Sequence, residues 1–282
     1  MLYHSELNLI SQLVALDLPA APSLLPDYTV ADMVTALLPE VARLQGDCAM
    51  SSAEWEQSLR LIQTNPTLTA LKILAYTNQP DSGLVGYCFS SPSPDTAIIA
   101  FRGTTGIGWI DNFKGAFLTD TPQQLKALAF FQQVDATFNF DHYIMTGHSK
   151  GGNNSQYLTI VYGDKIDLCV TFNSQGFSTE FIRQYDQEIA HNQSKIIAYE
   201  SAWDVVNILL NSIAGKRVVV GNESKLPHHN HPPNRLLDRS GAIRNLDIRH
   251  PFYTNLQNFT VNITGLASKA KQQFDKNKTT KK

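Results

Sequence analysis

The first part of the chain has the hydrophobic spacing of amphipathic helices. In residues 7–18 and 29–44 the apolar side chains recur every three or four positions, which is the period of a helix with one buried face. Residues 51–63 repeat this spacing and open with a Ser-x-x-Glu capping box at Ser51 or Ser52. We therefore expect a helical region over residues 1–66 that packs on the core of the protein.

The pattern changes to short β-rich runs at about residue 70. Three such runs occupy residues 71–77, 83–91 and 96–101, and the turn-forming sequences NQPDSG and SPSPD separate them. They predict a β-meander that leads into a longer sheet.

Helical and strand-like patterns then alternate. The predicted helices cover residues 121–138, 153–163, 178–190 and 203–213, and the predicted strands cover residues 142–147, 167–172, 195–201 and 216–220. Strands that alternate with helices of this length indicate right-handed βαβ crossovers and a mostly parallel central sheet. We expect an α/β core over residues 67–265, followed by a basic tail over residues 266–282.

Composition narrows the class of protein. Hydrophobic residues make up 43% of the 282 positions and the net charge is −2, so no overall positive field favours nucleic acid. The three cysteines, Cys48, Cys88 and Cys169, form no CxxC pair and are expected to be reduced core thiols. Six lysines against one aspartate in residues 268–282 are typical of a solvated end, with transient contact to an anionic membrane surface left open.

The location follows from the apolar segments. None approaches the roughly 18 residues of a membrane span, and the N-terminus lacks the basic start of a cleaved signal. A cytoplasmic protein is therefore expected, with export by a signal-less route left open.

One motif carries chemistry. Residues 146–152, Thr-Gly-His-Ser-Lys-Gly-Gly, lie between a predicted strand and a predicted helix. A strand that reverses into a helix within two residues places the central Ser149 at a sharp turn, and glycines flank it because a Cβ does not fit there. Ser149 is therefore a candidate nucleophile, whereas His148 beside it is expected to support the turn.

A serine nucleophile needs a histidine base and an acid, and in α/β-hydrolases these follow the serine in the order acid, then histidine, at the carboxyl ends of later strands. Asp204 follows the second strand after Ser149 and is the candidate acid, with Glu200 in reserve. The cluster Leu226–His231 follows the third strand and contains His228, His229 and His231. His250 is a rival base, and a zinc site at the cluster is disfavoured because no cysteine lies near.

The oxyanion formed in acyl transfer needs two hydrogen-bond donors. The backbone N–H of Lys150, directly after the nucleophile, is one candidate, and its side chain is expected to point away. Thr104 follows the predicted strand 96–101 and lies next to Gly103, and it is the other candidate. Residues 108–120, with Trp109, are expected to form either a lid that contacts an acyl chain or a helix packed on the sheet.

The sequence IIAFRGTTGIGWIDNF resembles the corresponding segment of the class 3 (fungal-type) lipases. With GHSKGGN at the serine it is more similar to a poorly characterised bacterial lipase-like family. In that family a "PGF" segment follows, matched here by Ser174–Phe177, and then "D-[IV]-V-G-x-L-L", matched from Asp204. Continuing without gaps places the family histidine on His229. The chain departs from the pattern at Asn207, which replaces a glycine, and by lacking the tryptophan after the histidine, which leaves His229 and His231 both open as the base.

The resemblance implies an α/β-hydrolase that cleaves carboxylic esters, such as those of acyl lipids. Ser149, His229 and Asp204 would form the triad, the N–H groups of Lys150 and Thr104 would form the oxyanion hole, and no metal or organic cofactor would be needed. The alternative hypothesis is a protein of hydrolase fold that serves binding, with weak or no catalysis. Substrate identity, oligomeric state and pathway stay open.

Overall fold

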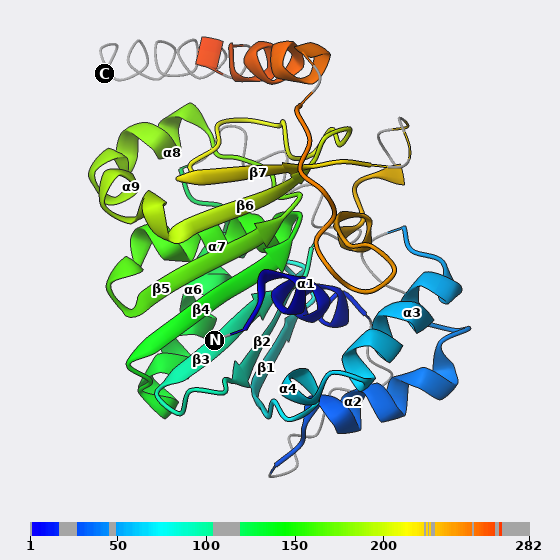
Figure 1. Cartoon of the computed structure of the whole chain (residues 1–282). Helices are drawn as coiled ribbons and strands as arrows, with labels where there is room; N and C mark the ends of the chain where they lie inside the picture. Colours follow the sequence, from blue (N-terminus) through cyan, green and yellow to red (C-terminus); the bar gives the residue numbers. More distant parts are fainter. Residues whose placement is uncertain are drawn as a thin grey trace.

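Seven strands form one sheet in the computed structural model of the chain (Figure 1). The structure describes residues 2–16, 27–44, 49–103, 119–222, 224, 226, 229–249, 251–262 and 265–266. The strands follow the order of the sequence: β1 (Ile73–Gln79), β2 (Leu84–Ser90), β3 (Thr96–Phe101), β4 (His142–His148), β5 (Ile166–Phe172), β6 (Ile196–Ser201) and β7 (Lys216–Val220). The pairs β1–β2 and β2–β3 are antiparallel and all later pairs are parallel, which confirms the predicted α/β-hydrolase fold with a mostly parallel sheet.

The helices that connect the parallel strands cover one face of the sheet. They are α6 (Pro122–Phe138), α7 (Lys150–Val161), α8 (Thr179–Gln184) and α9 (Asp186–Asn192). Because consecutive strands are neighbours in the sheet, right-handed crossovers place every connecting helix on the same side. In β3, Ala97, Ile99 and Phe101 belong to the hydrophobic cluster on this face. The single helix predicted over residues 178–190 is two short helices.

Segments from the two ends of the chain cover the opposite face. They are α1 (His4–Leu13), α2 (Val30–Leu37), α3 (Ser52–Gln63), α4 (Pro66–Thr69) and the short 3₁₀ helix η5 (Pro233–Leu236). In Figure 1 the helix α1 lies across the sheet in front of β4, with α2, α3 and α4 to one side. The alternate residues of β3, Ile98 and Ala100, pack into this second cluster. The division of the chain at residues 66 and 266 stays a prediction.

The helix predicted over residues 203–213 is absent, and the segment forms turns instead. The carboxylate of Asp204 accepts the backbone N–H groups of Val206 and Asn207, as a helix-capping residue does. The backbone does not continue as a helix because Leu210 has φ of 67°, in the left-handed region. Helical residues 251–262, which the sequence analysis did not predict, lie beyond β7 (Figure 1).

Cys88 and Cys169 are buried as free thiols, and Cys48 lies outside the described residues. Burial raises the pKa of both thiols to about 12, so neither is a nucleophile at neutral pH. Within the described ranges, no helix has the length and apolar character that crossing a membrane requires.

Candidate active site

Ser149 occupies the sharp turn between β4 and α7. Its φ and ψ of 54° and −122° are strained for a residue with a Cβ, and its backbone N–H donates to the carbonyl of Phe172 at 3.0 Å. The turn depends on its glycines: a Cβ on Gly147 would lie 2.5 Å from the backbone of Gly151. A Cβ on Gly151 would lie 2.0 Å from the carbonyl oxygen of Phe101 in β3. The sequence therefore folds into the tight strand–turn–helix that its motif predicted.

The histidine whose ring contacts the side chain of Ser149 is His231. Its Nε2 lies 3.1 Å from the Oγ of Ser149, and its Nδ1 lies 3.2 Å from a carboxylate oxygen of Asp204. The three residues follow β4, β7 and β6, so they meet at the carboxyl edge of the sheet. The gap-free register favoured His229, whereas the structure brings His231 within hydrogen-bond distance of Ser149, and His229 is exposed. His250 lies outside the described residues.

Asp204 is fully buried, and three donors surround its carboxylate. The backbone N–H groups of Val206 and Asn207 donate at 3.2 and 3.1 Å, and the Nδ1–H of His231 is the third donor. With the Nδ1–H of His231 directed at this carboxylate, Nε2 is left as an acceptor for the hydroxyl of Ser149.

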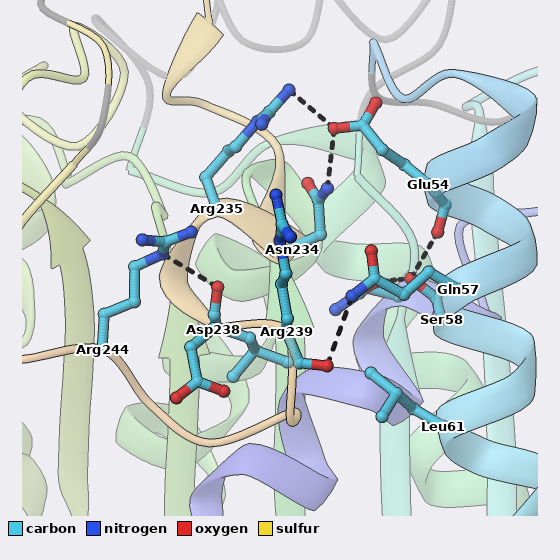
Figure 2. A pocket seen from close by; sticks show the side chains of 11 residues that line it. Glu54, Gln57, Ser58, Leu61, Asn234, Arg235, Asp238, Arg239 and Arg244 are labelled. Atoms are coloured by element: carbon cyan, nitrogen blue, oxygen red, sulfur yellow. Dashed lines mark hydrogen bonds and ion pairs between the residues drawn. The ribbon is translucent and has the colours of Figure 1, made fainter.

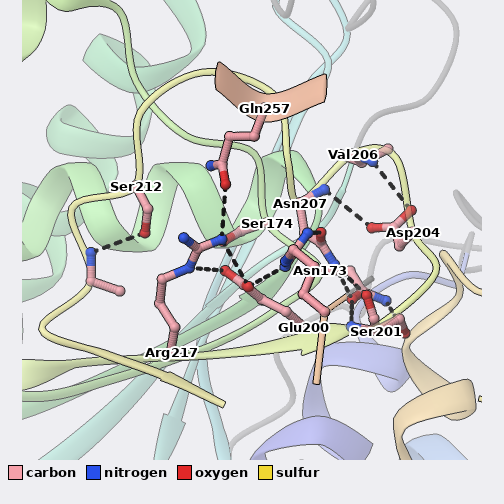
Figure 3. Close-up of polar contacts among 12 residues, drawn as sticks. Asn173, Ser174, Glu200, Ser201, Asp204, Val206, Asn207, Ser212, Arg217 and Gln257 are labelled. Carbon is pink, nitrogen blue, oxygen red and sulfur yellow. Dashed lines mark hydrogen bonds and ion pairs between the residues drawn. The ribbon is translucent and has the colours of Figure 1, made fainter. Parts of the chain in front are cut away.

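Glu200, the reserve acid, takes no part in this contact. Its carboxylate accepts hydrogen bonds from Nε and Nη2 of Arg217, at 2.9 and 3.0 Å (Figure 3). It also pairs with the guanidinium of Arg249. A buried carboxylate that pairs with two guanidinium groups has an electrostatic role in the fold. The structure therefore favours Asp204 over Glu200 as the partner of the histidine.

Two side chains hold the backbone of His231 in place. The Nε2–H of His148 donates to the carbonyl of His231 at 2.9 Å, and the amide of Asn173 donates to the same carbonyl at 2.8 Å. The rings of His148 and His231 lie 4.6 Å apart. Burial, and then the nearby charge of protonated His231, hold the pKa of His148 well below 6.5, against the effect of its bond to the His231 carbonyl. His148 is thus a neutral donor, and the turn-supporting role expected of it is joined by a contact that no sequence motif signals.

Lys150 begins α7, so its backbone N–H is at the positive end of the helix beside Ser149. Its side chain is fully buried and donates from Nζ to the Oδ1 of Asn153 at 3.0 Å and to the Oγ1 of Thr121 at 3.4 Å. The bond to Thr121 connects the turn at Ser149 to the start of α6. Thr104 and Trp109, the other predicted contacts to substrate, lie outside the described residues.

A polar cavity of about 210 Å³ lies between α3 and residues 234–244, and Figure 2 shows the side chains that line it. Its wall includes the ion pair between Glu54 and Arg235, with N and O atoms 2.6 Å apart, and it does not include Ser149. A neighbouring cavity of about 150 Å³ is lined by His229. Among the described residues, no three His, Cys, Asp or Glu side chains group as metal ligands.

Comparison with known proteins gives one family match. The model of the family described as Mbeg1-like matches residues 62–244, more than half of the chain. No curated protein matches the chain.

Among solved structures, the Lip2 lipase of Yarrowia lipolytica is similar at 12% identity and a TM-score of 0.47, with 77% of each chain covered. The Rhizomucor miehei lipase–propeptide complex has 14% identity and a TM-score of 0.40, with 64% of this chain and 72% of that chain covered. A triacylglycerol lipase from Penicillium expansum has 12% identity and a TM-score of 0.37, with 64% and 82% covered. Likenesses of this strength say nothing about activity, and the fold rests on the topology described above.

Proposed function

The chain belongs to the Mbeg1-like family, and from that premise and the array at the sheet edge we propose that it is a serine hydrolase of carboxylic esters. One observation carries the proposal: the side chains of Ser149, His231 and Asp204 make an unbroken series of contacts of 3.1 and 3.2 Å. A serine in a strained turn, an imidazole and a buried carboxylate in this order match the requirements of nucleophilic acyl transfer. His231 takes the role that the sequence register gave to His229.

The chemistry follows from the positions of the protons. The Oγ of Ser149 attacks the ester carbonyl while its proton passes to Nε2 of His231, and Asp204 stabilises the imidazolium. The backbone N–H of Lys150 donates to the oxyanion, and we assign the second donor to Thr104 on the basis of the sequence. The imidazolium protonates the departing alcohol, which leaves an acyl-enzyme. Water then gives a proton to His231 and attacks the acyl carbon. The imidazolium returns this proton to the Oγ of Ser149 as the bond between Oγ and the acyl carbon breaks, which releases the carboxylic acid and the free serine. No cofactor enters these steps.

The substrate class is proposed from the resemblance to lipases: an acyl lipid or another fatty ester, with Trp109 in contact with the acyl chain. Hydrolysis of p-nitrophenyl esters of increasing chain length tests this. We expect turnover by the wild type, none by Ser149→Ala, and a preference for longer acyl chains. Turnover that is independent of chain length would reject a lipid as the substrate and leave the proposal of an esterase.

Contact with an anionic membrane surface is proposed from the C-terminal part. Phe252, Phe259 and Leu266 are exposed. Phe252 and Phe259 are seven residues apart in helical residues 251–262, which puts them on one side of this helix. No charged residue occurs in residues 251–266, and the lysine-rich residues 268–282 follow. Sedimentation with phosphatidylglycerol vesicles should exceed that with phosphatidylcholine vesicles, and Phe252→Ser with Phe259→Ser should abolish the difference. Equal sedimentation with both lipids would reject this contact. A cytoplasmic location stays a proposal from the sequence alone.

A further inference from the structure

The orientation of the Asp204 carboxylate depends on the turn that follows it. Two of its contacts come from backbone N–H groups, those of Val206 and Asn207. A displacement of residues 206 and 207 would therefore move the carboxylate away from His231. This segment is not helical, and backbone hydrogen bonds tie it to Gly176 and Phe177 only at Leu209 and Asn211. The position of residues 206 and 207 therefore depends on side-chain contacts as well.

The side chain of Asn207 supplies those contacts. Its Nδ2 donates to the carbonyl of Ser201 at 3.1 Å and to the Oδ1 of Asn173 at 3.2 Å, and its Oδ1 accepts from Nη1 of Arg249 at 2.7 Å. A carbonyl accepts only and a guanidinium donates only, so one orientation of this amide satisfies both. Asn173 is fixed in the same way, because its Oδ1 accepts the backbone N–H of Ser201 while its Nδ2 donates to the carbonyl of His231. Figure 3 shows Asn207 and Asn173 between Asp204 and the ion pairs of Glu200.

Arg249 is held firmly enough to act as an anchor. Its side chain is 9% exposed, and its guanidinium pairs with Glu200, whose side chain is 3% exposed. Burial lowers the pKa of Arg249, while the charge of Glu200 and, to a smaller extent, that of Asp204 raise it. The charges of Arg249 and Asp204 thus stabilise each other, and both depend on the fixed geometry between them.

Asn207 and Arg249 are also the parts of this region that the family pattern does not supply. The resemblance predicts glycine at position 207, which has no side chain to bond, and Arg249 lies beyond the residues 62–244 that the family model matches. We propose that Arg249, acting through Asn207, is a positioning residue that holds the Asp204 carboxylate against His231. This inference rests on the proposed triad for its significance, and on the hydrogen bonds above for its geometry.

The test is solvent exchange of the Nδ1 proton of His231, followed by nitrogen-15 NMR of the histidine ring. The hydrogen bond to Asp204 protects this proton. Asn207→Gly and Arg249→Met should each speed its exchange by about tenfold, and the double variant should exchange no faster than either single variant. Arg217→Met is the matched control: it removes the other guanidinium from Glu200 but no bond to Asn207, so it should lower the thermal midpoint and leave the exchange unchanged.

Three results would overturn the proposal: an unprotected Nδ1 proton in the wild type, additive effects in the double variant, or equal acceleration by Arg217→Met. Arg249→Lys keeps the charge beside Glu200 with a single donor group, and it replaces Arg249→Met, with the same expected exchange, if that variant does not fold. Labelling by a fluorophosphonate is measured in parallel. An unlabelled wild type would reject the hydrolase proposal, whereas the exchange rates decide on Arg249 in either case.

Discussion

The two faces of the sheet are covered in different ways. On one face, α6, α7, α8 and α9 each connect strands that are neighbours in the sheet, so their contacts follow from chain order. On the other face, α1 packs on β4 and contacts η5, although the sequence separates α1 and η5 by more than 200 residues. One face is therefore built from local connections and the other from the meeting of distant segments.

This difference extends to the two halves of the candidate site. Ser149 directly precedes a crossover helix, α7, and is placed by the strand–turn–helix around it. His231 lies two residues before η5, and the amide of Asn8 in α1 donates to the carbonyl of Pro233, the first residue of η5, at 3.1 Å. The proposed nucleophile thus belongs to the locally built face, and the proposed base depends on the face built by long-range packing. The following predictions test this difference between the two faces.

The largest effect is expected at the base. His231→Ala should lower kcat for a p-nitrophenyl ester about a thousandfold or more, because Ser149 loses its proton acceptor. His229→Ala is the matched control from the same cluster and should stay within about twofold of the wild type. A larger loss of kcat in His229→Ala than in His231→Ala would assign the role of base to His229.

A single methyl group added at Gly151 should disrupt the turn that holds Ser149. Gly151→Ala places a Cβ against the carbonyl of Phe101, and neither backbone segment can withdraw without moving β3 or α7. We expect a loss of several kcal/mol in the free energy of unfolding, roughly 3 or more, and no soluble active enzyme. Gly221→Ala is the control, since the nearest atom to its Cβ would be 3.5 Å away. A stable, active Gly151→Ala protein would contradict the described turn.

Replacing one buried asparagine on each face compares the two faces directly. Asn8 joins α1 to the carbonyl of Pro233, and Asn192 joins the end of α9 to the carbonyl of Ile160. Replacing either with alanine should cost about 1–3 kcal/mol in urea unfolding, since a buried carbonyl loses its donor. Only Asn8→Ala should also reduce kcat, by about three- to tenfold, because Pro233 lies two residues from His231. Equal kcat in the two variants would show that α1 does not position the base.

The smallest effect concerns pH and His148. An unfolded imidazole binds a proton below pH 6.5, whereas burial keeps that of His148 neutral in the folded protein. The unfolded state then holds more protons, so the free energy of unfolding should fall as the pH drops below 6.5. The contribution of this group is at most about 1.4 kcal/mol per pH unit. His148→Gln should flatten the dependence in urea unfolding between pH 5 and 7.5. Since burial also lowers the pKa of His4, a residual slope should remain. Equal slopes in wild type and variant would contradict a neutral His148.

The contrast also explains what the sequence could predict. Ser149 and Asp204 follow strands with clear patterns, and the edge of a parallel sheet brings the ends of those strands together. His231 follows an irregular segment in which no period determines which histidine points inward. Asn230 fixes the backbone directly before His231, because its amide donates to the carbonyls of Trp203, Ser224 and Leu226. With that backbone held, His231 faces Ser149. Such bonds between distant residues leave no trace in hydrophobic spacing.

The helix predicted after Asp204 failed for a related reason. Its apolar spacing is helical, but the carboxylate and the side chain of Asn207 bind the backbone in turns. The contact of Arg249 with Asn207 spans 42 positions and was likewise out of reach of sequence analysis. Local sequence patterns therefore predicted the turn at Ser149, whereas long-range packing determines which histidine contacts Ser149 and what surrounds Asp204.

Covalent labelling by a fluorophosphonate, followed by peptide mapping, tests the proposed nucleophile most directly. We predict one probe per chain on Ser149 in the wild type, none on Ser149→Ala, and strongly slowed labelling of His231→Ala. A wild type that stays unlabelled, or equal labelling of Ser149→Ala, would contradict the proposal that this array is a serine hydrolase site.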